Sequence, residues 1–325
     1  MLSNKLSMMI LITGIFLLSA CVTLPASATP APTPPPLTLT SDAPRPTLES
    51  EGIGQNECAP YQVDARPPIN ILNPSYSLGG KWHSVFCLDN QGFSLTRFVN
   101  RDQNLVWNVS YYDSFWATTG QKAQNAKNGQ LLIERWSKDG QYVYLRPYWC
   151  CLDGPGMLFV NVFALYRMNL SDGQLEQIVA NSSFIRFSAD EKYLVYSSIL
   201  DDATIVISVR SLDIGHIENF QVEKKYTTVG LFSWDSQNGN ILFVGALNGW
   251  ENSLDTSTAE SKNGFSLLLL NLKTKQITTL INNDARLLRP INENTWVSEN
   301  VVRLSDANGQ IYEFDIQKLQ LTPAR

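Results

Sequence analysis

Histidine is scarce in this chain: His83 and His216 are the only two among 325 residues. The sequence also lacks a G-x-S-x-G elbow, an HExxH pair, a P-loop and a dinucleotide-binding fingerprint. His216 falls in a predicted turn, and we expect both histidines to be surface or turn residues. These absences argue against most nucleophilic, zinc-dependent and nucleotide-dependent enzymes, and we expect no cofactor.

Charge is sparse and slightly acidic. Asp, Glu, Lys and Arg make up 17% of the residues, and 30 acidic against 25 basic side chains give a net charge of −5. No basic patch or arginine cluster stands out, which argues against nucleic acid as a partner. Beyond the N-terminus, no apolar run is long enough to cross a bilayer.

The N-terminus has the parts of an export signal. Lys5 supplies a positive charge, Met8 to Leu18 form an apolar run too short for a membrane span, and small residues precede Cys21. The stretch resembles the lipobox of bacterial lipoproteins, whose cysteine becomes the lipidated N-terminus after cleavage. The resemblance implies a signal peptide at 1–20 and an acyl chain such as palmitate on Cys21. An ordinary secretory signal with a chance cysteine is the alternative.

Export fixes the expected location outside the cytoplasm, in the cell envelope. The lipid would hold the protein on the outer face of the plasma membrane, or on the outer membrane of a two-membrane bacterium. The segment that follows is rich in Pro, Thr, Ala and Ser, with no periodic apolar pattern. Such a composition cannot bury enough surface to offset its ordering entropy. We therefore predict that residues 21–57 form a disordered stalk. The alternative is that they contain a proline-rich motif that binds a partner.

A repeat runs through residues 58–325, the predicted folded domain. Its copies are YSLGGKWHSVF from Tyr76, WSKDGQYVYL from Trp136, FSADEKYLVY from Phe187, FSWDSQNGNILFV from Phe232 and a worn WVSENVVRL from Trp296. Each copy has an aromatic residue, a polar turn and an apolar strand, and a second hairpin follows it. Four short antiparallel strands per repeat are the layout of a β-propeller blade.

The motif resembles the FSPDG-type repeat of TolB-like and WD40-like bacterial propellers, although no copy carries the complete string. We predict an all-β propeller of five four-stranded blades. Six small blades would also fit the length, and a β-sandwich or β-helix is the alternative fold. The repeat aromatics Trp136, Phe187 and Phe232 should pack between blades. The aspartates Asp139, Asp190 and Asp235 should close turns through side-chain hydrogen bonds.

Four cysteines remain after lipidation of Cys21: Cys58, Cys87, Cys150 and Cys151. An even number outside the cytoplasm favours disulfides. Three pairings are possible, and we favour Cys58–Cys87, which would strap the entry segment onto the first blade. The adjacent pair has no nearby histidine, so a metal site or a redox centre there is a weak alternative.

Long loops give the main functional hint. In a propeller, loops between second and third strands lie on the same face as the connections between blades. The segments 112–130, 147–157 and 247–264 are predicted to lie there. They carry the ligand-face candidates Phe115, Trp116, Tyr148, Trp149 and Trp250. Aromatic rings on one face can form a contact surface for proteins, peptides or sugars, although they can also simply pack the loops onto the domain.

The sequence thus predicts a membrane-anchored binding or scaffold module for envelope proteins, peptides or glycans. The main alternative is a carbohydrate-active hydrolase with a carboxylate pair in the central cleft, since five-bladed propellers host such enzymes and their carboxylates need no local motif. A purely structural assembly subunit is a third class. It would show a large apolar outer surface.

Overall fold

The computed structural model describes residues 58–59, 62–63, 76–112, 129–149, 163–200, 203–247, 264–291 and 295–324. The predicted signal peptide, Cys21 and the linker to residue 57 lie outside these ranges. Within the ranges, no helix combines the length and the apolar character needed to cross a bilayer.

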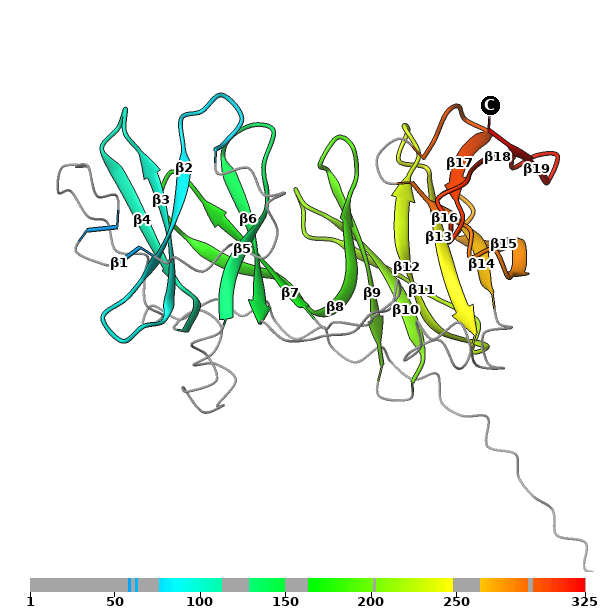
Figure 1. The fold of residues 1–325 in the computed structure, drawn as a ribbon, viewed down its shortest axis with the longest axis horizontal. Helices are drawn as coiled ribbons and strands as arrows, with labels where there is room; N and C mark the ends of the chain where they lie inside the picture. The colour runs from blue at the N-terminus through cyan, green and yellow to red at the C-terminus, as the bar shows by residue number, and fades with distance from the viewer. Residues whose placement is uncertain are drawn as a thin grey trace, which may run out of the picture. The chain divides into compact units, whose positions relative to one another are not determined.

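The described residues are almost entirely β-strands (Figure 1), which confirms the all-β class. The strands in chain order are β1 (Gln62–Val63), β2 (His83–Leu88), β3 (Ser94–Asn100), β4 (Leu105–Ser110), β5 (Gly129–Trp136), β6 (Tyr142–Trp149), β7 (Phe163–Asn169), β8 (Leu175–Phe187), β9 (Tyr193–Ile199), β10 (Ile205–Ser211), β11 (Ile217–Gln221), β12 (Tyr226–Trp234), β13 (Asn240–Leu247), β14 (Phe265–Asn271), β15 (Gln276–Asp284), β16 (Arg289–Pro290), β17 (Val301–Ser305), β18 (Ile311–Asp315) and β19 (Gln320–Pro323).

The strands form antiparallel units of four, each built from a continuous stretch of chain. Blade 1 holds β1 to β4, blade 4 holds β12 to β15, and blade 5 holds β16 to β19. Blades 2 and 3 share one seven-stranded sheet, β5 to β11, because the long strand β8 belongs to both. Its first half pairs with β7 and its second half with β9. The described residues therefore confirm a β-propeller with four-stranded blades, and they form five of them.

A turn of one length joins the first and second strands of blades 1 to 4, and blade 5 has a turn that is one residue shorter. An aromatic residue stands where each turn begins. These aromatics are Tyr76, Trp136, Phe187, Trp234 and Trp296. In blades 1 to 3 a serine follows the aromatic and accepts a hydrogen bond from the backbone N–H at the end of the turn. For Ser137 the donor is Tyr142, at 2.8 Å. The repeat seen in the sequence is thus a structural turn unit.

The predicted role of the turn aspartates is confirmed. The Ser137 hydroxyl donates to Asp139 at 2.6 Å, and the Ser188 hydroxyl donates to Asp190 at 2.7 Å. Each carboxylate also accepts a backbone N–H two residues on, so it closes its turn from both sides.

In blade 4 the turn unit begins two residues later than the sequence predicts. We expected Phe232 to open this copy, but Trp234 pairs with Ile241 at the position that the aromatic occupies in the other blades. Asp235 takes the place of the serine, and its carboxylate accepts the Gly239 N–H at 2.8 Å. The string FSWD resembles the repeat but lies two residues too early, because blade 4 has Asp235 where blades 1 to 3 have the serine.

Hydrophobic clusters fill the spaces between neighbouring blades. The cluster between blades 1 and 2 contains Phe98 and Trp136, whose rings meet edge to face with centroids 5.7 Å apart. Other clusters join blades 2 and 3 around Phe187, and blades 3 and 4 around Phe232. The expected packing of Trp136, Phe187 and Phe232 between blades is confirmed. The sheets stay together because each buries a face against the next one.

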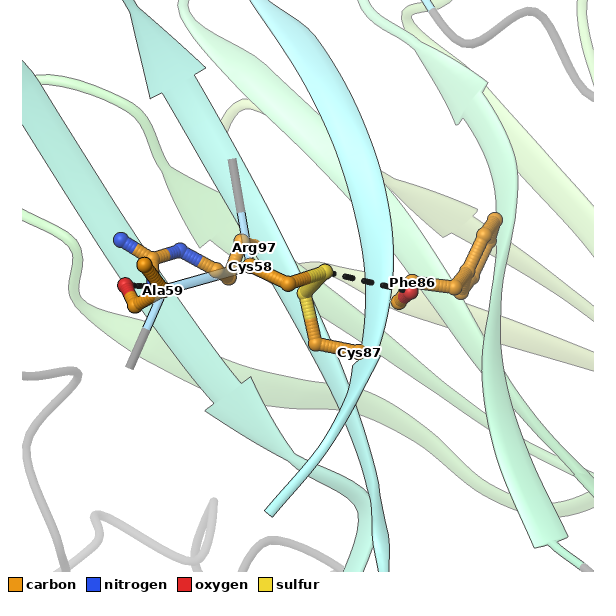
Figure 2. The surroundings of a disulfide bond; sticks show 5 residues. All are labelled: Cys58, Ala59, Phe86, Cys87 and Arg97. Atoms are coloured by element: carbon orange, nitrogen blue, oxygen red, sulfur yellow. Dashed lines mark hydrogen bonds between the residues drawn. A yellow bond between two sulfur atoms is a disulfide. The ribbon is translucent and has the colours of Figure 1, made fainter. Parts of the chain in front are cut away.

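A disulfide between Cys58 and Cys87 ties the entry segment to blade 1 (Figure 2), as predicted. This bond excludes the pairings that join either cysteine to Cys150 or Cys151, which lie outside the described ranges. The Arg97 guanidinium donates to the carbonyl of Ala59 at 2.7 Å. The Cys58 sulfur also lies 3.6 Å from the Phe86 carbonyl oxygen, a packing contact, since an oxidised sulfur has no proton to donate.

Burial of Tyr166 in the cluster between blades 1 and 2 makes the fold sensitive to alkali. Desolvation raises the pKa of this phenol to about 12, against about 10 in an unfolded chain. The neutral phenol therefore stabilises the fold fully below pH 10, and this contribution is lost as the pH rises toward 12. We expect Tyr166→Phe to remove about 2 kcal/mol of the stability loss between about pH 9 and 11.5. Urea unfolding across that range, compared between the two proteins, checks this. Equal losses in both would contradict it.

Candidate binding site

A groove of about 360 Å³ lies where the first strands of blades 2, 3 and 4 run into their turns. We call it the turn-end groove. Its lining comes from the ends of β5, β8 and β12 and the residues just after them, namely Glu134, Arg135, Lys138, Ile185, Arg186, Phe187, Ser188, Ala189, Ser233 and Trp234. Three blades thus contribute equivalent positions to one concave surface.

A β-bulge in each of these strands places the side chains that line the groove. The register shifts between Ile133 and Arg135 in β5, between Ser183 and Arg186 in β8, and between Gly230 and Ser233 in β12. The residue that resumes the pairing is in each case the one before the turn aromatic. Since a bulge redirects the side chains beside it, Arg135, Arg186 and Ser233 line the groove together.

The bulges also bring blades 3 and 4 close together. Phe184 in the β8 bulge has a positive φ of 54°. Its ring lies where a Cβ on Gly230 would stand, 2.4 Å away. Only a glycine at this position of β12 leaves room for the ring.

Ion pairs fix the charged groups of the groove across blades. Arg135 pairs with Glu191 of the next blade at 2.6 Å, and Glu191 also accepts the Lys138 backbone N–H at 2.8 Å. The Lys138 ammonium donates to the carbonyl of Ala189. Glu134 pairs with Arg146 at 3.2 Å. Because the Glu191 side chain is only 9% exposed, its ion pair is shielded from solvent and holds Arg135 in a defined position.

Aromatic rings form the apolar part of the wall. The Trp234 indole N–H donates to the Arg186 carbonyl at 3.2 Å, and its ring stacks on Tyr193 with centroids 6.1 Å apart. The Arg135 guanidinium lies over the Phe187 ring, 5.0 Å from its centroid. These contacts leave little rotamer freedom, so the groove is organised before any ligand enters.

The carboxyl groups with shifted pKa values favour the ionised form. Burial opposes ionisation of Asp190, but hydrogen bonds from Ser188, Lys192 and Asn238 outweigh it and lower the pKa. The Arg286 guanidinium lowers the pKa of Asp284, and Lys318 lowers that of Asp315. A catalytic general acid needs the opposite shift.

A larger cavity of about 490 Å³ lies between β11 of blade 3 and the β14–β15 side of blade 4. The Glu218–Lys275 ion pair, 3.3 Å long, spans its rim, and the Lys275 side chain is 64% exposed. Exposed pairs of this kind hold their geometry weakly. The turn-end groove is therefore the better candidate, although it is smaller.

The two histidines lie in different blades, His83 in blade 1 and His216 in blade 3, and neither lines the turn-end groove. His216 is in the turn before β11, 3.7 Å from Glu218, with its side chain 63% exposed. His83 was expected at the surface, but it is buried at the start of β2 beside the Tyr76 ring. No group of three or more His, Cys, Asp and Glu side chains suited to a metal occurs in the ranges described.

Only two of the predicted ligand-face residues lie within the described ranges. Phe115, Trp116 and Trp250 lie outside the described residues. Tyr148 and Trp149 were expected in a loop, but they complete β6, because the backbone there still pairs with Gln130 and Gly129 of β5. This is the opposite end of blade 2 from the turn-end groove, so the groove is a separate surface.

Sequence reasoning missed the groove because bulges interrupt the alternation that would place its side chains. One signal was present: an arginine stands immediately before the aromatic in both ERWSKD and IRFSAD. Equivalent positions in neighbouring blades lie on one side of a propeller. The repeated arginine therefore indicated a surface that neighbouring blades share.

No protein-family profile matches the sequence, and no curated protein matches it. Among solved structures, it is similar to the Kuenenia stuttgartiensis hydrazine synthase, with TM-score 0.44, 11% identity, and 76% of this chain and 65% of that chain covered. TolB from Acinetobacter baumannii has TM-score 0.36 and 14% identity, with coverages of 74% and 56%. The β-propeller domain of the Pyrococcus furiosus Trilobed protease has TM-score 0.43 and 9% identity, with coverages of 74% and 67%. The chain thus spans less than two thirds of the first two, and scores this low carry no information on function.

Proposed function

We propose that this protein is a non-catalytic binding module, held outside the cytoplasm by lipid on Cys21 and raised from the membrane by the stalk at 21–57. Its partners are envelope proteins, peptides or glycans, and it needs no cofactor. The lipobox-like N-terminus supports the location, and the pre-organised turn-end groove supports the binding role.

The observation that carries the proposal is the state of the carboxylates at the groove. Glu134 is engaged by Arg146, and Glu191 by Arg135. A two-carboxylate hydrolase needs one carboxyl kept protonated and the other directed at the substrate. Carboxylates committed to arginines instead stiffen a surface, which suits recognition better than hydrolysis.

The aromatic loop face is the second element of the proposal. Phe115, Trp116 and Trp250, together with Tyr148 and Trp149 at the end of β6, offer ring surface for a partner. Aromatic residues often carry much of the binding energy at protein interfaces because they bury large areas with few rotatable bonds.

Purification of the tagged full chain from native membranes tests the proposal. We expect the wild-type protein to fractionate with membranes and to retain a specific partner. The Trp116→Ala/Trp250→Ala variant should lose most of that partner while staying in the membrane fraction. Cys21→Ser should move the protein to the soluble fraction, because the acyl chains on this residue supply the membrane affinity.

Two results would overturn the proposal. One is that the Cys21→Ser variant stays in the membrane fraction, which would show that lipid on Cys21 is not what anchors the protein. The other is hydrolysis of envelope glycans by the wild-type protein with no partner retained, which would favour the carbohydrate-active alternative. If the Trp116→Ala/Trp250→Ala variant still retained the partner, the loop face would be excluded as the site where that partner binds.

A further inference from the structure

We propose that the outer edge of β11 is a further binding site, which takes an extended peptide as an additional strand of blade 3. The site is the cavity of about 490 Å³ between blades 3 and 4, which we call the edge cavity. It is lined by four consecutive residues of β11, Glu218 to Gln221, and by Leu268 and Ile277 of blade 4. The proposal goes beyond the proposed function, because it uses neither the lipid anchor nor the aromatic loop face.

The position of β11 in its sheet leaves one edge open. β11 is the last strand of the sheet: it pairs with β10 on one side, and no strand in the described ranges pairs with its other side. Successive side chains of a strand point to opposite faces, so a cavity lined by four consecutive residues runs along the edge of the strand and not over one face. Because β10 occupies one edge, the edge cavity follows the open one.

The pairing with β10 shows which backbone groups this edge offers. The Val222 N–H donates to the Ile205 carbonyl at 3.0 Å. Residues that bond across an antiparallel ladder alternate, so Phe220 also bonds to β10, whereas the N–H and C=O groups of Asn219 and Gln221 point away from it. Among the described residues, no backbone hydrogen bond satisfies these outward groups. Both residues are exposed.

The spacing of the outward groups selects a peptide. An extended peptide presents an N–H and a C=O on the same edge at every second residue, about 6.8 Å apart. Asn219 and Gln221 repeat at that spacing because they are themselves two residues apart in a strand. A glycan has no such repeat of amide donors and carbonyl acceptors. Addition of a strand to an open sheet edge is a common mode of peptide recognition, in which main-chain hydrogen bonds supply much of the affinity.

The floor of the edge cavity is apolar. Phe220, Leu268 and Ile277 all pack in the hydrophobic cluster between blades 3 and 4. Side chains of an added strand alternate between its two faces, so every second one would meet this floor. Valine or isoleucine at those positions would bury apolar surface there. The site therefore suits a peptide with apolar side chains at alternate positions.

Ion pairs at the rim do not select the charge of the peptide. Glu218 pairs with Lys275 at 3.3 Å. Glu223, which also lines the cavity, pairs with Lys225 at 2.9 Å. Each pair is neutral as a whole and largely exposed, so it can move aside when a ligand enters. Recognition depends instead on backbone groups that the ladder with β10 holds in place.

A second copy of the chain fits this edge less well than a peptide. A stable dimer interface takes about 800 Å² from each partner, which is roughly 20–30 residues. β11 has only five residues, and blade 4 flanks its open edge. A single peptide strand needs no more than this edge and the cavity beside it.

Fluorescence anisotropy of a labelled peptide, measured with the full chain in detergent, tests the proposal. The probe is a short peptide of repeating Thr-Val units, and its matched counterpart carries N-methyl groups on the central residues. We expect the unmodified peptide to bind at least about tenfold more tightly, because N-methylation removes the amide donors that would bond to β11. A third peptide, with serine in place of each valine, should also bind more weakly because it leaves the apolar floor uncovered.

Two variants of one residue locate the site. Asn219→Pro removes the outward N–H and blocks the edge with its ring, but it removes no hydrogen bond to β10. Asn219→Ala keeps the N–H and loses the same side chain, which accepts a hydrogen bond from the Ser208 hydroxyl. We expect the proline variant to lose at least about tenfold in affinity and the alanine variant to stay within about twofold. Thermal unfolding shows whether each fold is intact. If Asn219→Pro is unstable, Gln221→Pro and Gln221→Ala make the same comparison.

Equal affinity for the unmodified and N-methylated peptides would overturn the proposal. So would equal affinity of folded proline and alanine variants for the unmodified peptide. A dimer of the chain that excludes the peptide and that Asn219→Pro dissociates would assign the edge to a second copy instead. The Trp116→Ala/Trp250→Ala variant should bind the peptide as the wild-type protein does. Failure of the peptide test, with partner capture from membranes retained, would therefore leave the proposed function standing.

Discussion

Replacement of both Cys58 and Cys87 by alanine is expected to lower the free energy of unfolding by about 3–4 kcal/mol. The two residues are 29 positions apart, and the chain-entropy model gives this value for a closed loop of that length. In a domain of this size the melting temperature should fall by roughly 10 °C.

The structure shows why this bond carries so much weight. The entry strand β1 has two residues, which pair only with Leu88 and Cys87. Blade 1 and blade 5 are each built from their own stretch of chain, so none of the strands in the described ranges passes from one end of the propeller to complete the blade at the other end. Cys58 and Cys87 are both fully buried against Leu95. The disulfide is therefore the main restraint that holds the entry segment and β1 on blade 1.

Urea denaturation of the wild-type and double-alanine proteins measures this effect. A reductant should bring the wild-type protein down to the stability of the variant. A loss below about 1 kcal/mol, less than even a short closed loop supplies, would show that the strand pairing and the Arg97–Ala59 hydrogen bond hold the entry segment alone.

The sequence was sufficient for features that depend on local pattern. The turn unit could be predicted because a serine and an aspartate that follow an aromatic residue form hydrogen bonds within a few residues of one another, as Ser137 and Asp139 do. The Cys58–Cys87 pairing followed from the expected place of the first blade. The all-β class followed from strands and turns that alternate along the chain.

Other features of the strands escaped prediction. In blade 4 the string FSWD from Phe232 imitates the repeat, but the turn unit begins at Trp234, because Asp235 stands where blades 1 to 3 have a serine. The long strand β8 serves two blades because its pairing passes from β7 to β9 between Ser182 and Ser183 without an intervening loop. No turn residue in the sequence marks this change of partner. The repeated arginine indicated a surface shared by two blades, but the bulges that bring the lining of the turn-end groove together could be found only in the structure.

Gly173→Ala is expected to destabilise the protein by about 3–4 kcal/mol, through two effects that add. Gly173 lies in the turn between β7 and β8 with a φ of +70°, a conformation that costs an alanine about 1 kcal/mol or more. A Cβ at this position would also stand 2.5 Å from the Trp107 ring of blade 1. Trp107 is buried, and its indole N–H donates to the Leu170 carbonyl at 2.9 Å. The added methyl must push this ring out of its place between two blades.

Gly140→Ala separates the two effects. Gly140 has the same φ of +70°, but no atom lies within 4 Å of its Cβ position. We expect this control to cost only the backbone term of about 1 kcal/mol. The difference between the two alanine variants in urea unfolding then measures the packing of Trp107 against the Gly173 turn.

A double-mutant cycle with Trp107 tests whether this packing causes the loss of stability in Gly173→Ala. Trp107→Phe shortens the ring system that the new methyl would strike, so Gly173→Ala should cost less in that background than in the wild-type protein. Residues in direct contact show such non-additivity, while distant ones do not. Equal costs for Gly173→Ala in both backgrounds would mean that the strained backbone alone is responsible. In that case the Gly140 control should be as destabilising as Gly173→Ala, so the two measurements check each other.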